Sequence, residues 1–301
     1  MHIQTVGILS PGDMGHALGA VLLEHRLQVI TNLQGRSART VALAAGFSDV
    51  SDDETLVHEA DVLLSVLPPD RARALAERVA AALRASGARL LYVDCNAIAP
   101  HTVRAIEHLL TEAGADFVDG GLIGGPPQAG KPGPRLYVSG PRAEEVAQLR
   151  ACGLDVRVLG LRSGLASSLK MCYASVTKGL TALATIALVA GQAQGLQEAL
   201  LAELQALSLF PTIERAVPGM PPKAYRWVGE MEEIAQTFAH LGLPAQMAEG
   251  AAALYRFVQG TVLGTQTPEQ RQYGQTLEEV AALLAAALAQ RLPLREEEVE
   301  R

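Results

Sequence analysis

Short apolar runs alternate with longer segments of helical periodicity in the first half of the chain. Residues 6–9 form an apolar run typical of a buried strand, and the apolar residues of 14–25 recur every three or four positions, as in a helix. The alternation continues with predicted strands at 27–32, 60–67, 89–94, 116–119 and 136–139 and predicted helices at 37–45, 71–85 and 102–113. Strands joined by helices of this length need parallel crossovers, so the pattern predicts an α/β fold with a doubly wound parallel sheet.

The second half of the chain carries a different pattern. Runs of β-branched residues disappear after about residue 163, and segments of helical periodicity follow at 165–192, 196–209, 222–241, 245–258 and 276–289. The pattern predicts two domains: residues 1–162 hold the sheet, and residues 163–301 form an all-helical domain for substrate binding and dimerisation.

Composition and charge limit the classes of partner that this protein is expected to bind. The net charge of −7 provides no basic surface for nucleic acid or for an anionic membrane. The chain starts without the features of a signal peptide, and its longest apolar region, residues 179–191, is shorter than the ~20 residues that cross a bilayer. Cys95, Cys152 and Cys172 are widely spaced without a CxxC pair, which is typical of reduced thiols. We therefore expect a cytoplasmic protein with no membrane partner and no metal site.

A glycine-containing turn follows the first predicted strand and opens the first predicted helix. Its residues are Ser10, Pro11, Gly12, Asp13, Met14 and Gly15. In a βαβ unit such a turn lets backbone N–H groups bind a pyrophosphate, with Gly12 allowing close approach and Gly15 allowing close packing of the helix. Ser10 replaces the usual first glycine and Pro11 removes an N–H donor, so an ordinary strand-to-helix turn is the alternative interpretation.

The residues after the second predicted strand bear on which dinucleotide binds. NAD-binding domains usually place an Asp or Glu there for the ribose 2′-hydroxyl, whereas this chain has Asn32, and we expect no carboxylate near enough to repel a 2′-phosphate. Arg36, Ser37 and Arg39 follow and can donate charge-assisted hydrogen bonds to that phosphate. The sequence therefore predicts NADP(H) as the cofactor. The alternative is that both arginines lie on a solvated helix start.

With these elements in order, the chain resembles the β-hydroxyacid dehydrogenase superfamily, which includes 3-hydroxyisobutyrate and 6-phosphogluconate dehydrogenases. The segments that carry the resemblance are residues 6–15, 35–39, 60–68, 93–100, 117–125 and 164–170. Residues 166–171 and 226–234 are similar to a phosphogluconate-dehydrogenase-like subgroup that has its own helical C-terminal domain. The resemblance covers most of the chain and implies a Rossmann-type domain followed by an all-helical domain.

The resemblance also implies roles for the loops that follow the strands. Leu67 and Pro68 are expected near the adenosine side of the cofactor, and Asn96 beside the nicotinamide or the substrate. A turn residue at a strand end is the alternative interpretation of Asn96.

A substrate loop is expected at residues 123–125. Ile123 stands where hydroxyacid enzymes of the superfamily have a serine, and Gly124 with Gly125 can present backbone N–H groups to a substrate carboxylate. A simple turn is the alternative for this pair. Trp227 is a candidate for lining the substrate pocket, although its apolar stripe is also typical of a core or a dimer interface.

Lys170 occupies the position of the superfamily's catalytic lysine on a long helix. We expect it to act as general acid in reduction and as general base in oxidation, because no acidic residue lies within a helical turn to hold it charged. A surface lysine is the alternative. Tyr173 and Ala174 stand where relatives have His and Asn, so Tyr173 is either a second proton donor or a packing residue.

These features predict an NADP(H)-dependent oxidoreductase that transfers a hydride to or from a small hydroxy acid or carbonyl compound. The alternatives are an NADPH-dependent imine reductase, which shares the architecture, and a non-catalytic NADPH sensor. The alanine-rich helices of the second half predict a homodimer. The sequence does not identify the substrate.

Overall fold

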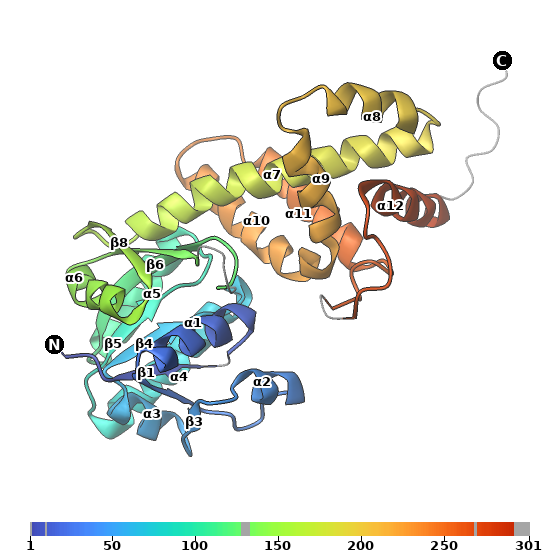
Figure 1. Ribbon diagram of the computed structural model, residues 1–301. Helices are drawn as coiled ribbons and strands as arrows, with labels where there is room; N and C mark the ends of the chain where they lie inside the picture. The colour runs from blue at the N-terminus through green and yellow to red at the C-terminus, as the bar shows by residue number, and fades with distance from the viewer. Residues whose placement is uncertain (1, 10, 128–132, 268–269, 292–301) are drawn as a thin grey trace. The chain divides into compact units, whose positions relative to one another are not determined.

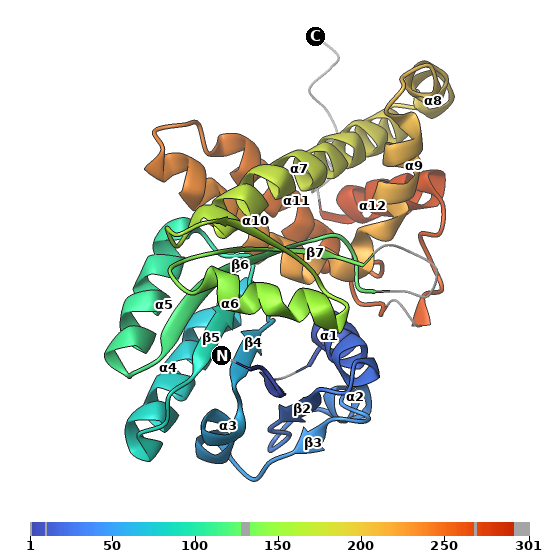
Figure 2. The same ribbon diagram turned by 60° about the vertical axis from the view of Figure 1, so that its left-hand side comes forward.

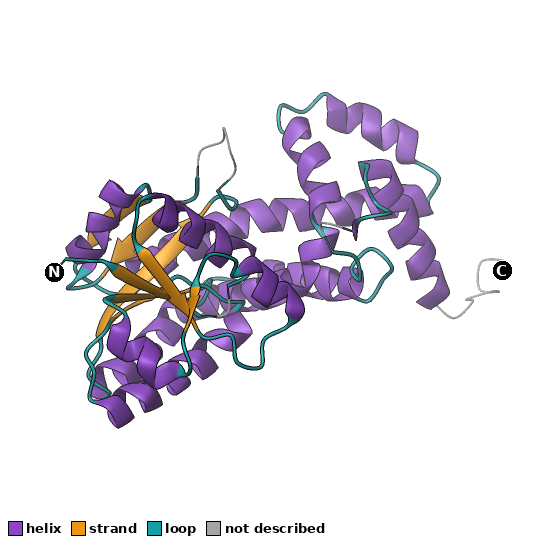
Figure 3. Ribbon diagram, turned by 60° about the horizontal axis from the view of Figure 1, so that its bottom comes forward, coloured by secondary structure: helices purple, strands orange, loops and turns teal. Residues whose placement is uncertain are grey.

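The chain divides into two compact units, Met1–Tyr173 and Ala174–Arg301. The computed structural model describes residues 2–9, 11–127, 133–267 and 270–291. In these residues the strands all lie in the first unit, whereas the second unit contains helices and connecting loops (Figure 3).

The first unit is built on one sheet. Its described strands are β1 (Thr5–Ile8), β2 (Gln28–Thr31), β3 (Ser48–Asp49), β4 (Val62–Ser65), β5 (Leu91–Asp94), β6 (Asp116–Ile123), β7 (Arg135–Ser139) and β8 (Asp155–Gly160). They lie in the order β3-β2-β1-β4-β5-β6-β7-β8, and every neighbouring pair is parallel except β6 with β7. The predicted doubly wound sheet is confirmed, and β3 and β8 are strands that the sequence analysis missed.

Helices cover both faces of this sheet (Figures 1 and 2). They are α1 (Asp13–Glu24), α2 (Ala38–Leu43), α3 (Asp53–Glu59), α4 (Pro69–Ser86), α5 (Pro100–Glu112), α6 (Ala143–Val146) and the short 3₁₀ helix η1 (Ala147–Cys152). Buried residues of α3, α4 and α5 form one apolar core with the sheet, and those of α1 and α6 form the other. The sheet is therefore enclosed between two layers of helices.

The two cores explain why the sequence of a central strand is an unbroken run of apolar residues. In β4, Val62 and Leu64 pack into the core under α1, whereas Leu63 points to the opposite face and packs into the core under α4 and α5. All three side chains are fully buried. A parallel strand covered on both faces needs apolar residues at every position, which hides the two-residue alternation.

The second unit confirms the predicted all-helical region. Its helices are the later part of α7 (Leu165–Ala193), α8 (Gln197–Gln205), α9 (Phe210–Gly219), the 3₁₀ helix η2 (Pro221–Lys223), α10 (Ala224–His240), α11 (Gln246–Gln259) and α12 (Leu277–Arg291). The predicted helix over 196–209 is too long, because α8 ends at Gln205 and the unpredicted α9 begins five residues later.

Helix α7 begins in the first unit and continues into the second, so the two units are divided after Tyr173, within the helix. The sequence pattern predicts a boundary between residues 162 and 163, just before this helix. A Cβ atom added to Gly121 of β6 would lie 2.7 Å from the carbonyl oxygen of Ala166, so the first turns of α7 lie directly against the sheet. This packing explains why those turns group with the first unit.

By length and composition alone, α7 is the one described helix that is long and apolar enough to cross a membrane. Half of its most apolar 18-residue window is buried inside the protein.

Candidate functional site

The glycine turn links β1 to α1, as the sequence predicts. A Cβ atom on Gly15 would lie 3.3 Å from Cγ2 of Ile8, so the helix packs closely on the strand at this glycine. A Cβ atom on Gly12 would meet nothing within 4 Å, so the backbone of Gly12 faces open space at the N-terminus of α1. This arrangement fits a phosphate lying against the turn. Ser10 lies outside the described residues.

Two of the predicted phosphate ligands already have partners within the protein. Arg39 forms an ion pair with Asp13 at 2.6 Å, which ties the start of α2 to the start of α1. The Ser37 hydroxyl caps α2 by accepting the N–H of Thr40 at 3.2 Å. Arg39 therefore links the starts of the two helices, and Ser37 stabilises the start of α2.

Arg36 is different, because its guanidinium Nε is buried and donates to no partner among the described residues. Burial lowers the pKa of Arg36 from its ordinary value, repulsion by Arg78 lowers it further, and attraction to Asp53 opposes both effects. A buried guanidinium donor without an acceptor is costly, so this nitrogen fits an anionic ligand such as a phosphate.

The expectation of no carboxylate near the end of β2 is wrong. Asp49 accepts the backbone N–H of Leu33 at 2.9 Å, and Asp53 accepts the side-chain amide of Asn32 at 2.8 Å. Both acids come from β3 and the start of α3, elements that the sequence analysis did not predict. A signal for α3 was present, since Asp52 caps the helix by accepting the N–H of Thr55, a pattern typical of helix starts.

Asn96 and Leu67, predicted to contact the cofactor, contact each other. The backbone N–H of Leu67 donates to Oδ1 of Asn96 at 2.6 Å, and the Asn96 amide donates to the Ser65 hydroxyl at 2.8 Å. The Asn96 side chain is buried. It therefore holds the loop that continues through Pro68 at the end of β4.

Asp94 lies beneath this loop at the end of β5. Its Oδ1 accepts the N–H of Asn96 at 2.9 Å, whereas its Oδ2 is buried with no partner among the described residues. Burial, together with the nearby Asp119 carboxylate, raises the pKa of Asp94 to about 7, although the hydrogen bonds from Asn96 oppose the rise. Near neutral pH this carboxyl group is therefore partly protonated.

Asp119 of β6 fastens the start of α7. Its Oδ2 accepts the N–H groups of Gly164 and Ser167, at 2.9 and 3.1 Å, and the Ser139 hydroxyl at 2.9 Å; its Oδ1 accepts the Ser167 hydroxyl. Burial raises the pKa of Asp119 above its ordinary value, and these hydrogen bonds oppose the rise. The carboxyl group thus satisfies donors of the first helical turn that would otherwise lack acceptors.

Lys170 lies on the next turn of α7, and its ammonium group donates to the backbone carbonyl of Leu122, near the end of β6. The predicted substrate loop follows directly. Ile123 is buried, Gly124 has a φ of +124°, and Gly125 faces open space. Because β1, β4, β5 and β6 run parallel, their carboxyl ends share one edge of the sheet. The structure therefore brings Lys170 and the predicted loops of the first unit to that edge.

Trp227 belongs to a packed cluster within the second unit. Its ring meets Tyr255 edge-on with centroids 5.3 Å apart, and the Lys178 ammonium lies 5.3 Å from the Trp227 ring centroid. Lys178 forms an ion pair with Glu230 at 2.7 Å, and both side chains are almost fully buried. Tyr173 is 44% exposed.

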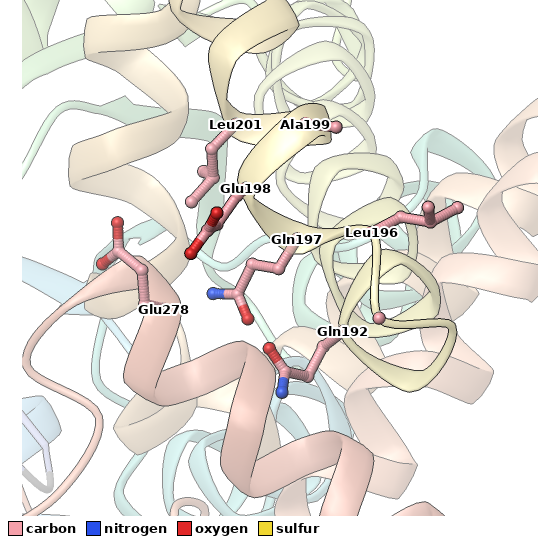
Figure 4. Close-up of a pocket in the computed structure, with 8 residues that line it drawn as sticks. Gln192, Leu196, Gln197, Glu198, Ala199, Leu201 and Glu278 are labelled. Atoms are coloured by element: carbon pink, nitrogen blue, oxygen red, sulfur yellow. The ribbon is translucent and has the colours of Figure 1, made fainter.

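Two pockets lie within the second unit. One, of about 730 Å³, lies where α8 and the end of α7 meet α12, and Glu198, Gln197 and Glu278 border it (Figure 4). The other, of about 490 Å³, has an almost wholly apolar lining from α7, α10 and α11. The described residues contain no group of three His, Cys, Asp or Glu side chains placed to hold a metal ion.

Two family models match the chain. Residues 5–152 match the NAD binding domain of 6-phosphogluconate dehydrogenase, and residues 192–258 match a domain of unknown function, DUF1932.

Solved structures share the fold over most of the chain. The conserved protein MTH1747, described as structurally similar to 3-hydroxyacid dehydrogenases, is 28% identical with a TM-score of 0.63, over 85% of this chain and 96% of its own. The 3-hydroxyisobutyrate dehydrogenase of Mycobacterium tuberculosis with L-serine is 18% identical with a TM-score of 0.66, over 97% and 100% of the two chains. A reductive aminase from Aspergillus terreus in complex with NADPH and ethyl-5-oxohexanoate is 19% identical with a TM-score of 0.52, over 86% and 93%.

We predict that Asp94→Asn makes the free energy of unfolding less dependent on pH. The folded pKa of about 7 exceeds the value of about 3.9 for an unfolded Asp, so the folded state binds more protons between these values. The contribution of Asp94 to stability is therefore undiminished below about pH 4 and falls by a few kcal/mol, on the order of 2–4, as pH rises to about 7. Urea unfolding at about pH 5 and about pH 8 measures the change.

The exposed Asp70 provides the matched control, because Asp70→Asn removes a carboxylate of the same size from the surface. The Asp94 variant should gain stability relative to wild type at the higher pH, and the Asp70 variant should not. An equal pH dependence in the Asp94 variant and the wild type would contradict the raised pKa.

Proposed function

The chain belongs to the β-hydroxyacid dehydrogenase superfamily of nicotinamide-dependent oxidoreductases, and on that premise we propose that it is an NADP(H)-dependent dehydrogenase or reductase. Its substrate is a small hydroxy acid or the corresponding carbonyl compound. The observation that carries the proposal is the position of Lys170, whose ammonium group lies at the carboxyl edge of the sheet that also holds the glycine turn. The free cysteines favour a cytoplasmic location.

The choice of NADP(H) rests on which charged groups near the end of β2 already have partners: the two acids do, and within the described part of the chain the Nε of Arg36 does not. Asp53 is already neutralised by Arg78 at 2.6 Å, and Asp49 is bonded to the backbone of Leu33. Arg36 keeps a buried Nε with no acceptor among the described residues. A 2′-phosphate supplies the missing acceptor together with opposite charge, whereas a neutral ribose hydroxyl supplies no charge.

Lys170 is the group that moves the proton. When bound, the nicotinamide supplies or accepts a hydride at the substrate carbon. In oxidation, neutral Lys170 accepts the hydroxyl proton as the C–H hydride leaves; in reduction, the ammonium form returns that proton to the carbonyl oxygen. The Leu122 carbonyl orients the Lys170 side chain through its hydrogen bond, and Asp119 fixes the helical turn that precedes it.

A carboxylate on the substrate fits the loop after β6. Gly125 faces open space, so no side chain hinders a carboxylate that approaches its backbone N–H. The preceding Gly124 adopts a φ of +124°, a conformation that other residues rarely adopt. Ile123 is buried, so this residue contributes its backbone to the loop.

An imine reductase is the second candidate, because the reductive aminase from Aspergillus terreus shares the fold and was solved with NADPH. Protonation of a developing amine nitrogen needs the same kind of donor as protonation of an alkoxide. A non-catalytic NADPH sensor is the third candidate. It would bind the cofactor without turning over any substrate.

We also propose a homodimer formed through the helices of the second unit. Val176, Leu183 and Ile186 of α7 are exposed, and the first two lie seven residues apart on one helix face. A Cβ atom on Gly179, between them, would meet nothing within 4 Å, so a second helix can approach closely. An exposed apolar stripe with this spacing is typical of helix pairing.

We predict that Arg36→Ala weakens NADPH binding about ten-fold or more and leaves NADH binding nearly unchanged, because the lost charge-assisted bond is specific to the 2′-phosphate. Titration calorimetry with both dinucleotides measures the change. Equal affinities of the wild type for NADPH and NADH would refute the preference.

We predict that Lys170→Ala lowers turnover by about 10²–10⁴-fold and leaves NADPH affinity unchanged, because the proton donor is lost. NADPH oxidation with 2-oxo acids, β-keto acids, aldehydes and cyclic imines identifies the substrate class on which the variant is then tested. Tyr173→Phe serves as the companion variant, since it removes only the candidate second donor. Near-full turnover by Lys170→Ala would rule out the mechanism, and the absence of turnover on every class would favour the sensor.

We predict a dimer by light scattering at micromolar concentration, and a monomer for the double variant Val176→Glu with Leu183→Glu, because buried charges oppose apolar contact. The matched control is Leu161→Glu, which places the same charge on an exposed leucine of the first unit. A wild-type monomer would contradict the dimer.

A further inference from the structure

Asp53 joins three elements around the end of β2. One carboxylate oxygen accepts the Asn32 amide at 2.8 Å, and the other accepts Nε and Nη2 of Arg78 at 3.1 and 2.6 Å. Asn32 directly follows β2, Asp53 begins α3, and Arg78 lies in the middle of α4. The backbone N–H of Gln34 donates to the same Asn32 side chain, so the loop that leads to Arg36 is bonded to this group.

The loop that leads to Arg36 and the guanidinium of Arg78 are thus bonded to the same group of side chains, Asn32 and Asp53. The pKa of Arg36 is lowered by burial and by Arg78, and Asp53 only partly opposes these effects. The two arginines and Asp53 carry a net charge of +1, and their repulsion is relieved when an anion joins them. Arg78 remains 42% exposed, so its guanidinium keeps donors on the solvent side.

We propose that Arg78, oriented by Asp53, is the second cation of the 2′-phosphate site, opposite Arg36. The inference rests on the proposed use of NADP(H). Asp53 has two functions in this site: it fixes the direction of the Arg78 guanidinium, and it limits the repulsion between the two arginines before the phosphate binds. A dianionic phosphate gains from both guanidinium groups, whereas a ribose hydroxyl gains little from either.

A purely structural ion pair between α3 and α4 is the competing explanation. Such a pair would stabilise the fold, and its loss would weaken the binding of every adenine nucleotide equally. The proposed site instead raises the affinity only for ligands with a 2′-phosphate. This gain in affinity decreases as salt screens the charges. The ratio of two affinities therefore separates the explanations, because a general loss of stability cancels in that ratio.

The test measures dissociation constants of adenosine 2′,5′-bisphosphate and of 5′-AMP by titration calorimetry with the full chain. We expect Arg78→Gln to weaken binding of the bisphosphate about ten-fold and to leave AMP within about two-fold. Arg78→Lys should restore part of the preference, since it returns the charge without the planar geometry. The matched control is Arg73→Gln, which removes an exposed arginine of the same helix that pairs with Glu77 at 3.0 Å.

The outcomes distinguish this inference from the proposed function. A wild type that binds the bisphosphate no more tightly than AMP contradicts the NADP(H) preference itself. A wild-type preference that Arg36→Ala abolishes and Arg78→Gln leaves intact overturns the role of Arg78 alone. Equal weakening of both nucleotides by Arg78→Gln identifies a structural ion pair and also overturns the proposal.

Discussion

The attachment of α7 to β6 through Asp119 is the constraint on which the site depends. One buried carboxyl group accepts hydrogen bonds from the backbone and side chains of the first helical turn and from Ser139 of the neighbouring strand β7. Lys170 follows Ser167 by three residues, so its position along β6 is set by the same contact. The absence of a side chain at Gly121 allows the helix to lie this close to the sheet. Asp119, Gly121 and the spacing from Ser167 to Lys170 thus determine where the Lys170 ammonium group lies.

Much of the first unit could be predicted from the sequence, because its signals are local. A parallel strand buried on both faces needs an unbroken apolar run, and β4 and β5 have one. The turn at Gly12 and Gly15 could be placed because it separates a strand from a helix. The superfamily resemblance singled out Lys170 as the candidate general acid and base. Periodicity alone could not distinguish it from a surface lysine.

The remaining features depend on contacts between distant segments. Strand β3 has only two residues, too few to show a pattern. Without this strand, the sequence does not predict that Asp49 and Asp53 lie near the end of β2. Asn96 looked like a group free to bind the cofactor, yet its amide is used by Ser65 and Leu67. Glu230 is a further example: spacing along its own helix favours Arg226 as a partner, whereas packing of α7 against α10 supplies Lys178.

The buried pair of Lys178 and Glu230 restricts how this unit can change during evolution. Loss of either partner leaves one charge in an apolar interior beside Trp227 and Tyr255, at a cost of about 3–5 kcal/mol, a large part of the stability of a typical domain. Joint replacement by two apolar residues carries no such cost. The two positions are therefore expected to covary among related sequences, present together or absent together, with single substitutions removed by selection.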